Sequence, residues 1–230
     1  MPAHATLRRL KTETADLHRQ AEQHIHILEP EASVGDYAAY LRAMYGFHAP
    51  LERAFMHHDA LRRAGFEPEL RQRAHLIASD LRAIGALEPW PECVSLPPTA
   101  TLGHALGVAY VLEGSTLGGH YVLSKLPASI TTGTTGTTGT TGTTGTTGTT
   151  DATKFLRGYG EATGERWRQF GSVLAAAIPN DAIEDHVIDA ARSSFECLVR
   201  WLVACEQPRS ASSGPTRGAS VTARRAPSRG

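Results

Sequence analysis

The 230-residue sequence predicts an all-α protein with about six main helices. Apolar residues recur at helical spacing in several long segments, and no segment alternates apolar and polar residues as a half-buried β-strand would. Prolines lie between these segments, where they begin or end helices. The predicted helices are residues 6–28, 35–57, 68–87, 100–126, 152–177 and 181–206.

The first two predicted helices each carry one apolar stripe. Pro50 lies inside the second helix and should kink it, because proline lacks an N–H donor and its ring clashes with the preceding turn. The stripe of the first helix consists of Leu7, Leu10, Thr14, Leu17, Ala21 and Ile25. The stripe of the second consists of Tyr37, Leu41, Met44, Tyr45, Leu51 and Phe55.

The later helices are delimited mainly by proline. The third begins at Pro68, the fourth ends before Pro127, and Pro179 separates the fifth from the sixth. Several further prolines lie between the third and fourth helices, where they end or start these segments. These are Pro89, Pro91, Pro97 and Pro98.

Two segments are not expected to contribute to the packed domain. Residues 131–150 repeat threonine and glycine, which have no large apolar side chain to offset the entropy of ordering. They are predicted to form a flexible insert between two helices. Residues 208–230 are rich in Ser, Pro and Arg and are predicted to be a disordered basic tail. Residues 1–207, apart from the insert, are expected to form a single domain.

The composition excludes several classes of protein. The formal net charge is zero, so no overall attraction to nucleic acid or to an anionic membrane is expected. The most apolar window, residues 102–123, contains Glu113 and is not expected to span a membrane. Three cysteines without a CxxC motif, and a polar N-terminus without a signal peptide, favour a reduced, cytoplasmic protein. A monomer or weak dimer is expected.

The fourth predicted helix contains the unusual segment "TLGHALGVAYVLEGSTLGGHYVLSKL". Glycine within a helix costs about 1 kcal/mol relative to alanine, so the glycines here need a reason. Two readings are open: close packing of another helix, or a flat ligand lying against exposed backbone. Most of these glycines, together with Tyr110, fall within a sector of roughly 80° on one face of the helix, and Gly119 lies outside that sector. The residues on that face are Gly103, Gly107, Tyr110, Gly114 and Gly118.

The first predicted helix contains "LKTETADLHRQAEQ", residues 10–23. His18 and Glu22 are four residues apart and share a helix face. A metal-bound histidine usually donates its second ring N–H to an acceptor such as a carboxylate, a role open to Glu22. Lys11 lies two turns earlier on nearly the same face, where a cation could meet an anionic group of a ligand. The alternative for His18 and Glu22 is an ordinary surface contact. His4, His48, His75 and His186 are isolated in the sequence and are expected to lie on the surface.

These motifs resemble those of the haem oxygenases. "LKTETADLHRQAE" is similar to the first helix of that family, whose proximal histidine lies in H-x-x-A-E, and "AYVLEGSTLGGHYVLSKL" is similar to the distal helix of bacterial biliverdin-forming members. "ATKFLRGYGEATGERWRQF" also resembles the family in order and position. The resemblance covers residues 6–206 apart from the Thr/Gly insert. It implies a single-domain helical fold with haem between the first helix and a kinked, glycine-rich distal helix.

On the proximal side, the resemblance implies that His18 is the axial iron ligand and that Glu22 is its hydrogen-bond partner. It implies that Lys11 pairs with a haem propionate. Two further basic propionate contacts of mammalian members fall on Leu156 and Gly160 in this sequence. Nearby basic residues that could take over this contact are Lys154, Arg157 and Arg166.

On the distal side, the resemblance implies that Gly114 and Gly118 bring backbone against the haem face, and that Tyr110 and Gly119 also line the cofactor site. The expected catalytic residues are Gly114, Gly118 and Ser115. In mammalian members an aspartate, which orders catalytic water, occupies the place of Ser115. A serine can also hold a water but brings no charge.

The implied activity treats haem as both cofactor and substrate. Dioxygen and external electrons cleave it to biliverdin, ferrous iron and carbon monoxide. The sequence has no flavin or nucleotide fingerprint, so an external electron donor, a ferredoxin or a reductase, is expected.

Three alternatives to this function differ in what they require of the sequence. The alternative on the same fold is a haem-binding carrier or sensor that does not degrade haem. A di-iron oxidase would need two Glu-x-x-His motifs, which the sequence lacks. A helical interaction domain without a cofactor would leave the spacing of His18, Glu22 and Lys11 unexplained.

Overall fold

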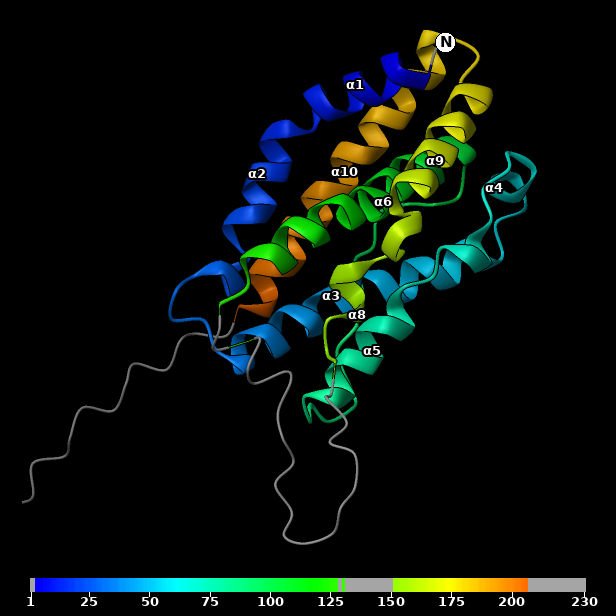
Figure 1. Cartoon of the computed structure of the whole chain (residues 1–230). Helices are drawn as coiled ribbons and strands as arrows, with labels where there is room; N and C mark the ends of the chain where they lie inside the picture. Colours follow the sequence, from blue (N-terminus) through cyan, green and yellow to red (C-terminus); the bar gives the residue numbers. More distant parts are fainter. Residues whose placement is uncertain (1–2, 128–129, 131–150, 207–230) are drawn as a thin grey trace, which may run out of the picture.

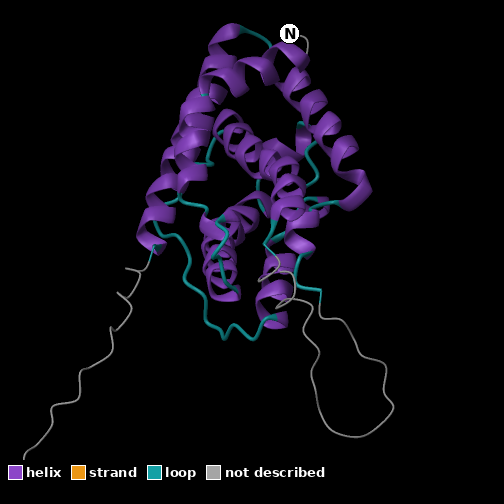
Figure 2. Cartoon of the chain, turned by 60° about the vertical axis from the view of Figure 1, so that its left-hand side comes forward, coloured by secondary structure: helices purple, strands orange, loops and turns teal. Residues whose placement is uncertain are grey.

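The computed structural model describes residues 3–127, 130 and 151–206. All the regular secondary structure within these residues is helical, which confirms the predicted all-α class (Figures 1 and 2). The Thr/Gly segment 131–150 and the basic tail 208–230 lie outside the described residues. Among the described residues, no helix is long and apolar enough to cross a membrane. The helices are α1 (Ala3–Glu13), α2 (Ala15–Gln23), α3 (Val34–Met56), α4 (Asp59–Arg63), α5 (Ala74–Ala83), α6 (Leu102–Lys125), α8 (Lys154–Arg157), α9 (Thr163–Ala177) and α10 (Asp181–Cys205).

The first predicted helix is divided into α1 and α2, which meet at a bend in Figure 1. The division falls at Thr14, whose hydroxyl donates to the backbone oxygen of Leu10 at 2.7 Å. Such back-bonding by threonine competes with the helix ladder and bends helices. A short 3₁₀ turn, His26–Leu28, completes the region that was predicted to be helical.

The fifth predicted helix is likewise divided, into α8, a 3₁₀ turn over Gly160–Ala162, and α9. Gly158 and Gly160 have φ angles of 54° and 59°, a left-handed conformation that glycine adopts without a steric penalty. Helical periodicity on both sides therefore concealed a turn. By contrast, α3 continues through Pro50 to Met56.

Helices α6 and α10 form the centre of the molecule, and the other helices pack around them (Figure 1). The first half of α6 is buried, with Ala105, Leu106 and Val108 fully inaccessible to solvent. Gly107 allows the close approach of α10: a Cβ atom there would lie 2.6 Å from the Cβ atom of Ala190. The α6–α10 pair is thus the rigid base on which the remaining helices are positioned.

The outer helices pack on different sides of this base. Helices α1 and α2 pack against α10, and α1 also contacts α9. Helix α3 packs against α5, and α8 fits between α5 and α6. Asp80 of α5, which is fully buried, fixes the start of α8 by accepting the backbone N–H groups of Lys154 at 3.1 Å and Phe155 at 2.8 Å.

Candidate functional site

His18 projects from α2 with 58% of its side chain exposed, and Glu22, one turn later, is 59% exposed. The Nδ1 atom of His18 lies 3.4 Å from a carboxylate oxygen of Glu22. Phe195 of α10 contacts the imidazole edge to face, with ring centroids 5.7 Å apart. Nε2 has no hydrogen-bond partner among the described residues. An oriented imidazole with one free nitrogen has the arrangement expected of a metal ligand.

The glycines of α6 have two different environments. Gly103 and Gly107 face α10, and Gly119 faces α8, where a Cβ atom would lie 2.6 Å from the backbone oxygen of Leu156. Close helix packing therefore accounts for these three residues. The prediction that Gly119 lines the cofactor site gains no support from this geometry, because α8 already occupies the space beside its Cα atom.

Gly114 and Gly118 are the two glycines of α6 without a packing partner. A Cβ atom at either position would have no neighbour within 4 Å beyond the adjoining turns of its own helix. Gly118 is exposed, as are the large side chains of Leu117 and Tyr121 beside it. Both glycines have ordinary helical backbone, and α6 continues through them without interruption. This part of α6 presents bare backbone, with apolar and aromatic groups alongside.

Tyr110 connects α6, which bears the glycines, to the junction of α1 with α2, the helix that bears His18. Its hydroxyl lies near the side chain of Thr14, at the junction of α1 and α2, and burial raises its pKa. Its ring packs against Trp167 of α9 at a centroid distance of 6.0 Å. Both α2 and α6 pack on α10, yet they make little direct contact with each other among the described residues. His18 and the bare backbone of Gly114 thus belong to two helices that share one neighbour but remain apart.

Lys11 is exposed in the last turn of α1, and no described residue forms an ion pair with it. Its ammonium group is therefore available to an anion. The other basic residues considered for a propionate are already bound. Lys154 donates to Ser79 at 2.8 Å, Arg157 pairs with Asp151 at 3.2 Å, and Arg166 lies 4.0 Å from a Glu67 carboxylate oxygen.

Ser115 follows Gly114 and bonds to the interior of the protein. Its hydroxyl donates to the backbone oxygen of Leu112 at 2.7 Å and accepts from the guanidinium of Arg73 at 2.9 Å. Arg73 is only 1% exposed and also donates to the Leu112 oxygen. A buried positive charge therefore lies behind α6, beside the hydroxyl of Ser115, which itself carries no charge.

Glu52 of α3 holds Arg73 in place. Its carboxylate accepts the backbone N–H groups of Arg73 and Ala74 at 3.0–3.2 Å, and lies 3.2 Å from Nδ1 of His48. Burial alone would raise the pKa of Glu52, but the hydrogen bonds from His48 and the backbone outweigh it and lower the pKa. Burial lowers the pKa of His48. The expectation that His48 lies on the surface is wrong: it is 2% exposed.

A buried ion pair lies on the other side of Gly114. Glu113 binds Arg71 at 2.6 Å and accepts the hydroxyl of Tyr159 at 2.8 Å. The two residues that flank Gly114 are thus each bound to a buried arginine. Neither arginine was predicted as a site residue, because Arg71 and Arg73 lie in a polar segment typical of a solvated surface and only the tertiary structure buries them.

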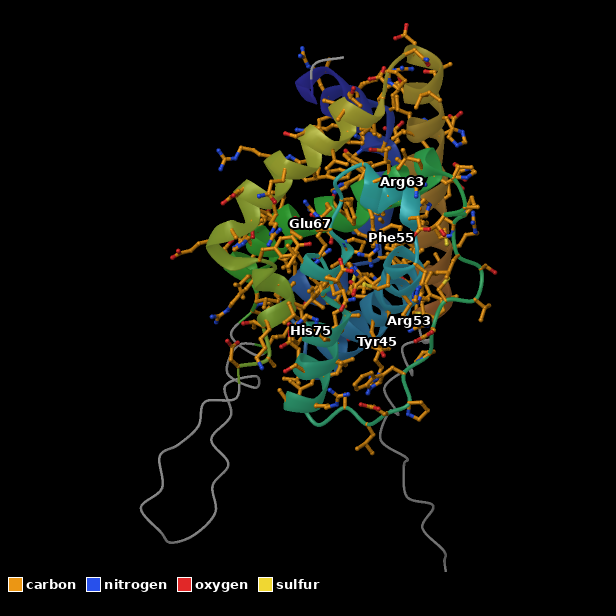
Figure 3. All side chains as sticks on the ribbon, turned by 90° about the vertical axis from the view of Figure 1, so that its right-hand side faces the viewer. Tyr45, Arg53, Phe55, Arg63, Glu67 and His75 are labelled. Atoms are coloured by element: carbon orange, nitrogen blue, oxygen red, sulfur yellow. The ribbon has the colours of Figure 1, made fainter. Side chains whose placement is uncertain are left out.

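The described residues contain no group of three or more His, Cys, Asp or Glu side chains that could hold a metal ion. A small cavity lined by buried residues lies behind α6, and an open groove runs along α3 and α5, on the face shown in Figure 3. In that figure, Tyr45, Arg53 and His75 mark the groove, and Phe55 marks the wall of the cavity. Neither is lined by His18, Gly114 or Gly118.

Comparison with known proteins identifies a family and a shared fold. The family model described as heme oxygenase matches residues 4–204. Among solved structures, that of heme oxygenase from Neisseria meningitidis, studied with bound NO and CO, is similar, with a TM-score of 0.67 and 22% sequence identity. The match covers 87% of this chain and 91% of that chain, and shows a shared fold. Comparison with curated protein sequences gives no match.

Proposed function

Because the chain belongs to the haem oxygenase family, we propose that it cleaves haem with dioxygen and externally supplied electrons to biliverdin, ferrous iron and carbon monoxide. Family and fold make it an enzyme of haem degradation. The proposal of haem cleavage to biliverdin rests on one observation: His18 is exposed on α2, and bare backbone is present at Gly114 and Gly118 on α6.

His18 is the proposed axial ligand of the substrate haem. Glu22 can accept the Nδ1–H of the neutral ring, which leaves Nε2 to bind iron, and the 3.4 Å separation should shorten when the imidazole is fixed by the metal. Phe195 limits rotation of the ring from the other side. A single neutral histidine leaves haem iron able to bind dioxygen, which is the chemistry that the substrate itself supplies.

Gly114 and Gly118 are proposed to let the opposite haem face approach the backbone of α6, since neither position carries a side chain that would hold the porphyrin away. Leu117 and Tyr121 offer apolar surface beside them. Tyr110, between Thr14 and Trp167, would close one end of the site.

Ser115 is proposed to order a water molecule, with Arg73 in support. A hydroxyl group has one donor and two acceptor positions. The donor of Ser115 binds the Leu112 oxygen and one acceptor position binds Arg73, so one acceptor position remains for a water. The cationic partner polarises the hydroxyl and fixes its rotamer. An ordered water can supply protons during dioxygen reduction, the role of an acid in this chemistry.

Lys11 is proposed to bind one haem propionate, because its ammonium is exposed and has no ion pair among the described residues. The partners already bound to Lys154 and Arg157 make those residues weaker candidates. Electrons are proposed to come from a separate ferredoxin or reductase.

The test is a titration of the purified full chain with hemin, followed by reduction in air with ascorbate or a reductase system. The proposal expects saturation at one haem per chain, then loss of the Soret band and growth of biliverdin absorbance. His18→Ala should abolish the iron–histidine Raman mode, whereas His75→Ala, on the exposed face of α5, should preserve both the mode and turnover. Haem that binds to the unaltered chain but survives reduction would identify a carrier and refute the proposed cleavage.

A further inference from the structure

The small cavity behind α6 lies between the Arg71–Glu113 cluster and the Glu52–Arg73 cluster. Its volume is about 10 Å³, and its polar lining consists of Glu52, Arg71 and Glu113. The rest of the wall is apolar and includes Phe55, Phe66 and Leu112. About 10 to 15 Å³ is the space that one water molecule requires, so the cavity can hold one water and nothing larger.

Arg71 supplies an unused donor at this cavity. Its side chain is 3% exposed, and its Nε atom is buried without a hydrogen-bond partner among the described residues. A buried charged donor left unpaired is strongly unfavourable, so such donors normally bind protein or ordered water. The terminal nitrogens of Arg71 are bound to Glu113 and to the backbone oxygen of Arg166, which leaves Nε as the group in need of an acceptor.

The two carboxylates have acceptor positions to spare. A carboxylate offers about four acceptor positions. Glu113 receives Arg71 and Tyr159, and Glu52 receives two backbone N–H groups and His48. A water in the cavity would accept from Nε of Arg71 and donate to each carboxylate, the three hydrogen bonds typical of a buried water.

We propose that this cavity binds one ordered water, and that this water joins the Arg71–Glu113 and Glu52–Arg73 clusters into one network behind Gly114. Glu113 anchors the segment before the glycine through Arg71. Glu52 holds the backbone of Arg73, whose guanidinium anchors Ser115 after the glycine. Gly114 itself has no packing partner, so the network fixes the bare segment from behind.

The presence of the water in the cavity does not depend on haem, whereas its effect on a haem bound at Gly114 rests on the proposed function. The first test is therefore a high-resolution crystal structure of the full chain without haem. The proposal expects a density peak about 2.7–3.2 Å from Nε of Arg71 and within the same range of a Glu52 oxygen. An empty cavity in well-ordered density would overturn it.

The second test fills the cavity. Leu112→Met places a longer, flexible side chain in the cavity wall, and Leu106→Met makes the same change at a buried position of α6 outside it. Both swaps conserve volume well enough for the chain to fold. Leu112→Met should lose the water peak and shift the CO stretching frequency of the ferrous haem complex, because Ser115 and Gly114 move. Leu106→Met should retain both.

An unchanged CO frequency in Leu112→Met after loss of the water would refute the proposed role of the network. Failure of the unaltered chain to bind haem would instead contradict the proposed function. In that case the haem-free crystal would still decide whether the water is present.

Discussion

Gly118→Ala should stabilise the haem-free protein and impair haem cleavage, because the space beside this glycine lacks any protein neighbour. A Cβ atom there has no contact within 4 Å beyond the adjoining turns, so the substitution causes no clash. Helix propensity then favours alanine by about 1 kcal/mol. For a domain of this size that corresponds to a rise in Tm of about 2–4 °C. If haem lies against this backbone, the added methyl group intrudes on the haem or on its bound dioxygen.

The neighbouring glycine provides the matched control. Gly119→Ala would place a Cβ atom 2.6 Å from the backbone oxygen of Leu156, which cannot move aside as a flexible side chain would. It should destabilise the protein by about 1–3 kcal/mol, the usual cost of overpacking. The assays are thermal unfolding of the haem-free proteins, followed by circular dichroism, and biliverdin formation by the haem complexes. A Gly118→Ala protein that is less stable than the unaltered protein would refute the claim that the space beside Gly118 is empty. A Gly118→Ala protein that is more stable and retains full turnover would refute the claim that haem lies against this glycine.

Further predictions concern single side chains. His18→Ala should lose the axial nitrogen ligand and nearly all turnover, and added imidazole should restore the Soret position. Ser115→Ala should cost about 1–3 kcal/mol in urea unfolding, because it leaves a guanidinium N–H of buried Arg73 without an acceptor. It should also raise peroxide release during turnover. Burial raises the pKa of Asp80 from 3.8 to about 6, although two backbone N–H groups of α8 oppose the shift. The folded state therefore binds a proton more tightly than the unfolded chain. This contribution to the free energy of unfolding is present below about pH 4 and lost as the pH rises through about 6. Asp80→Asn should remove that slope from a series of unfolding curves.

The order of the helices was predictable because burial on α6 and α10 imposes a regular apolar period on each segment that packs there. The points at which the first and fifth predicted helices are divided were harder to predict from the sequence. Thr14 divides the first helix through one side-chain hydrogen bond, and a threonine at that position is also compatible with an unbroken helix. Gly158 and Gly160 end α8 through their left-handed backbone, which the glycine-rich sequence permits but does not require.

The candidate site was predictable only where its pattern is local. His18 and Glu22 are one turn apart, so their common face follows from helix geometry alone. The buried support behind α6 depends instead on α3, α5 and α6 meeting in space. Nothing within its own segment distinguishes Arg73 from a surface arginine, because its partners Glu52 and Ser115 are 21 and 42 residues away.

The spacing of supports along α6 has a consequence for how such a site changes over time. The helix rests on α10 at Gly107 and on α8 at Gly119, and the bare backbone of Gly114 spans the interval between them. Arg71 and Arg73 hold Glu113 and Ser115 within this interval, so the position of the segment relative to α10 depends on the packing at both ends as well as on these buried arginines. Enlarging Ala190 or displacing Leu156 would lift one end and tilt the span. Substitutions at positions that do not contact the ligand can therefore change the orientation of the ligand-binding surface of α6, even when no residue of the site itself is substituted.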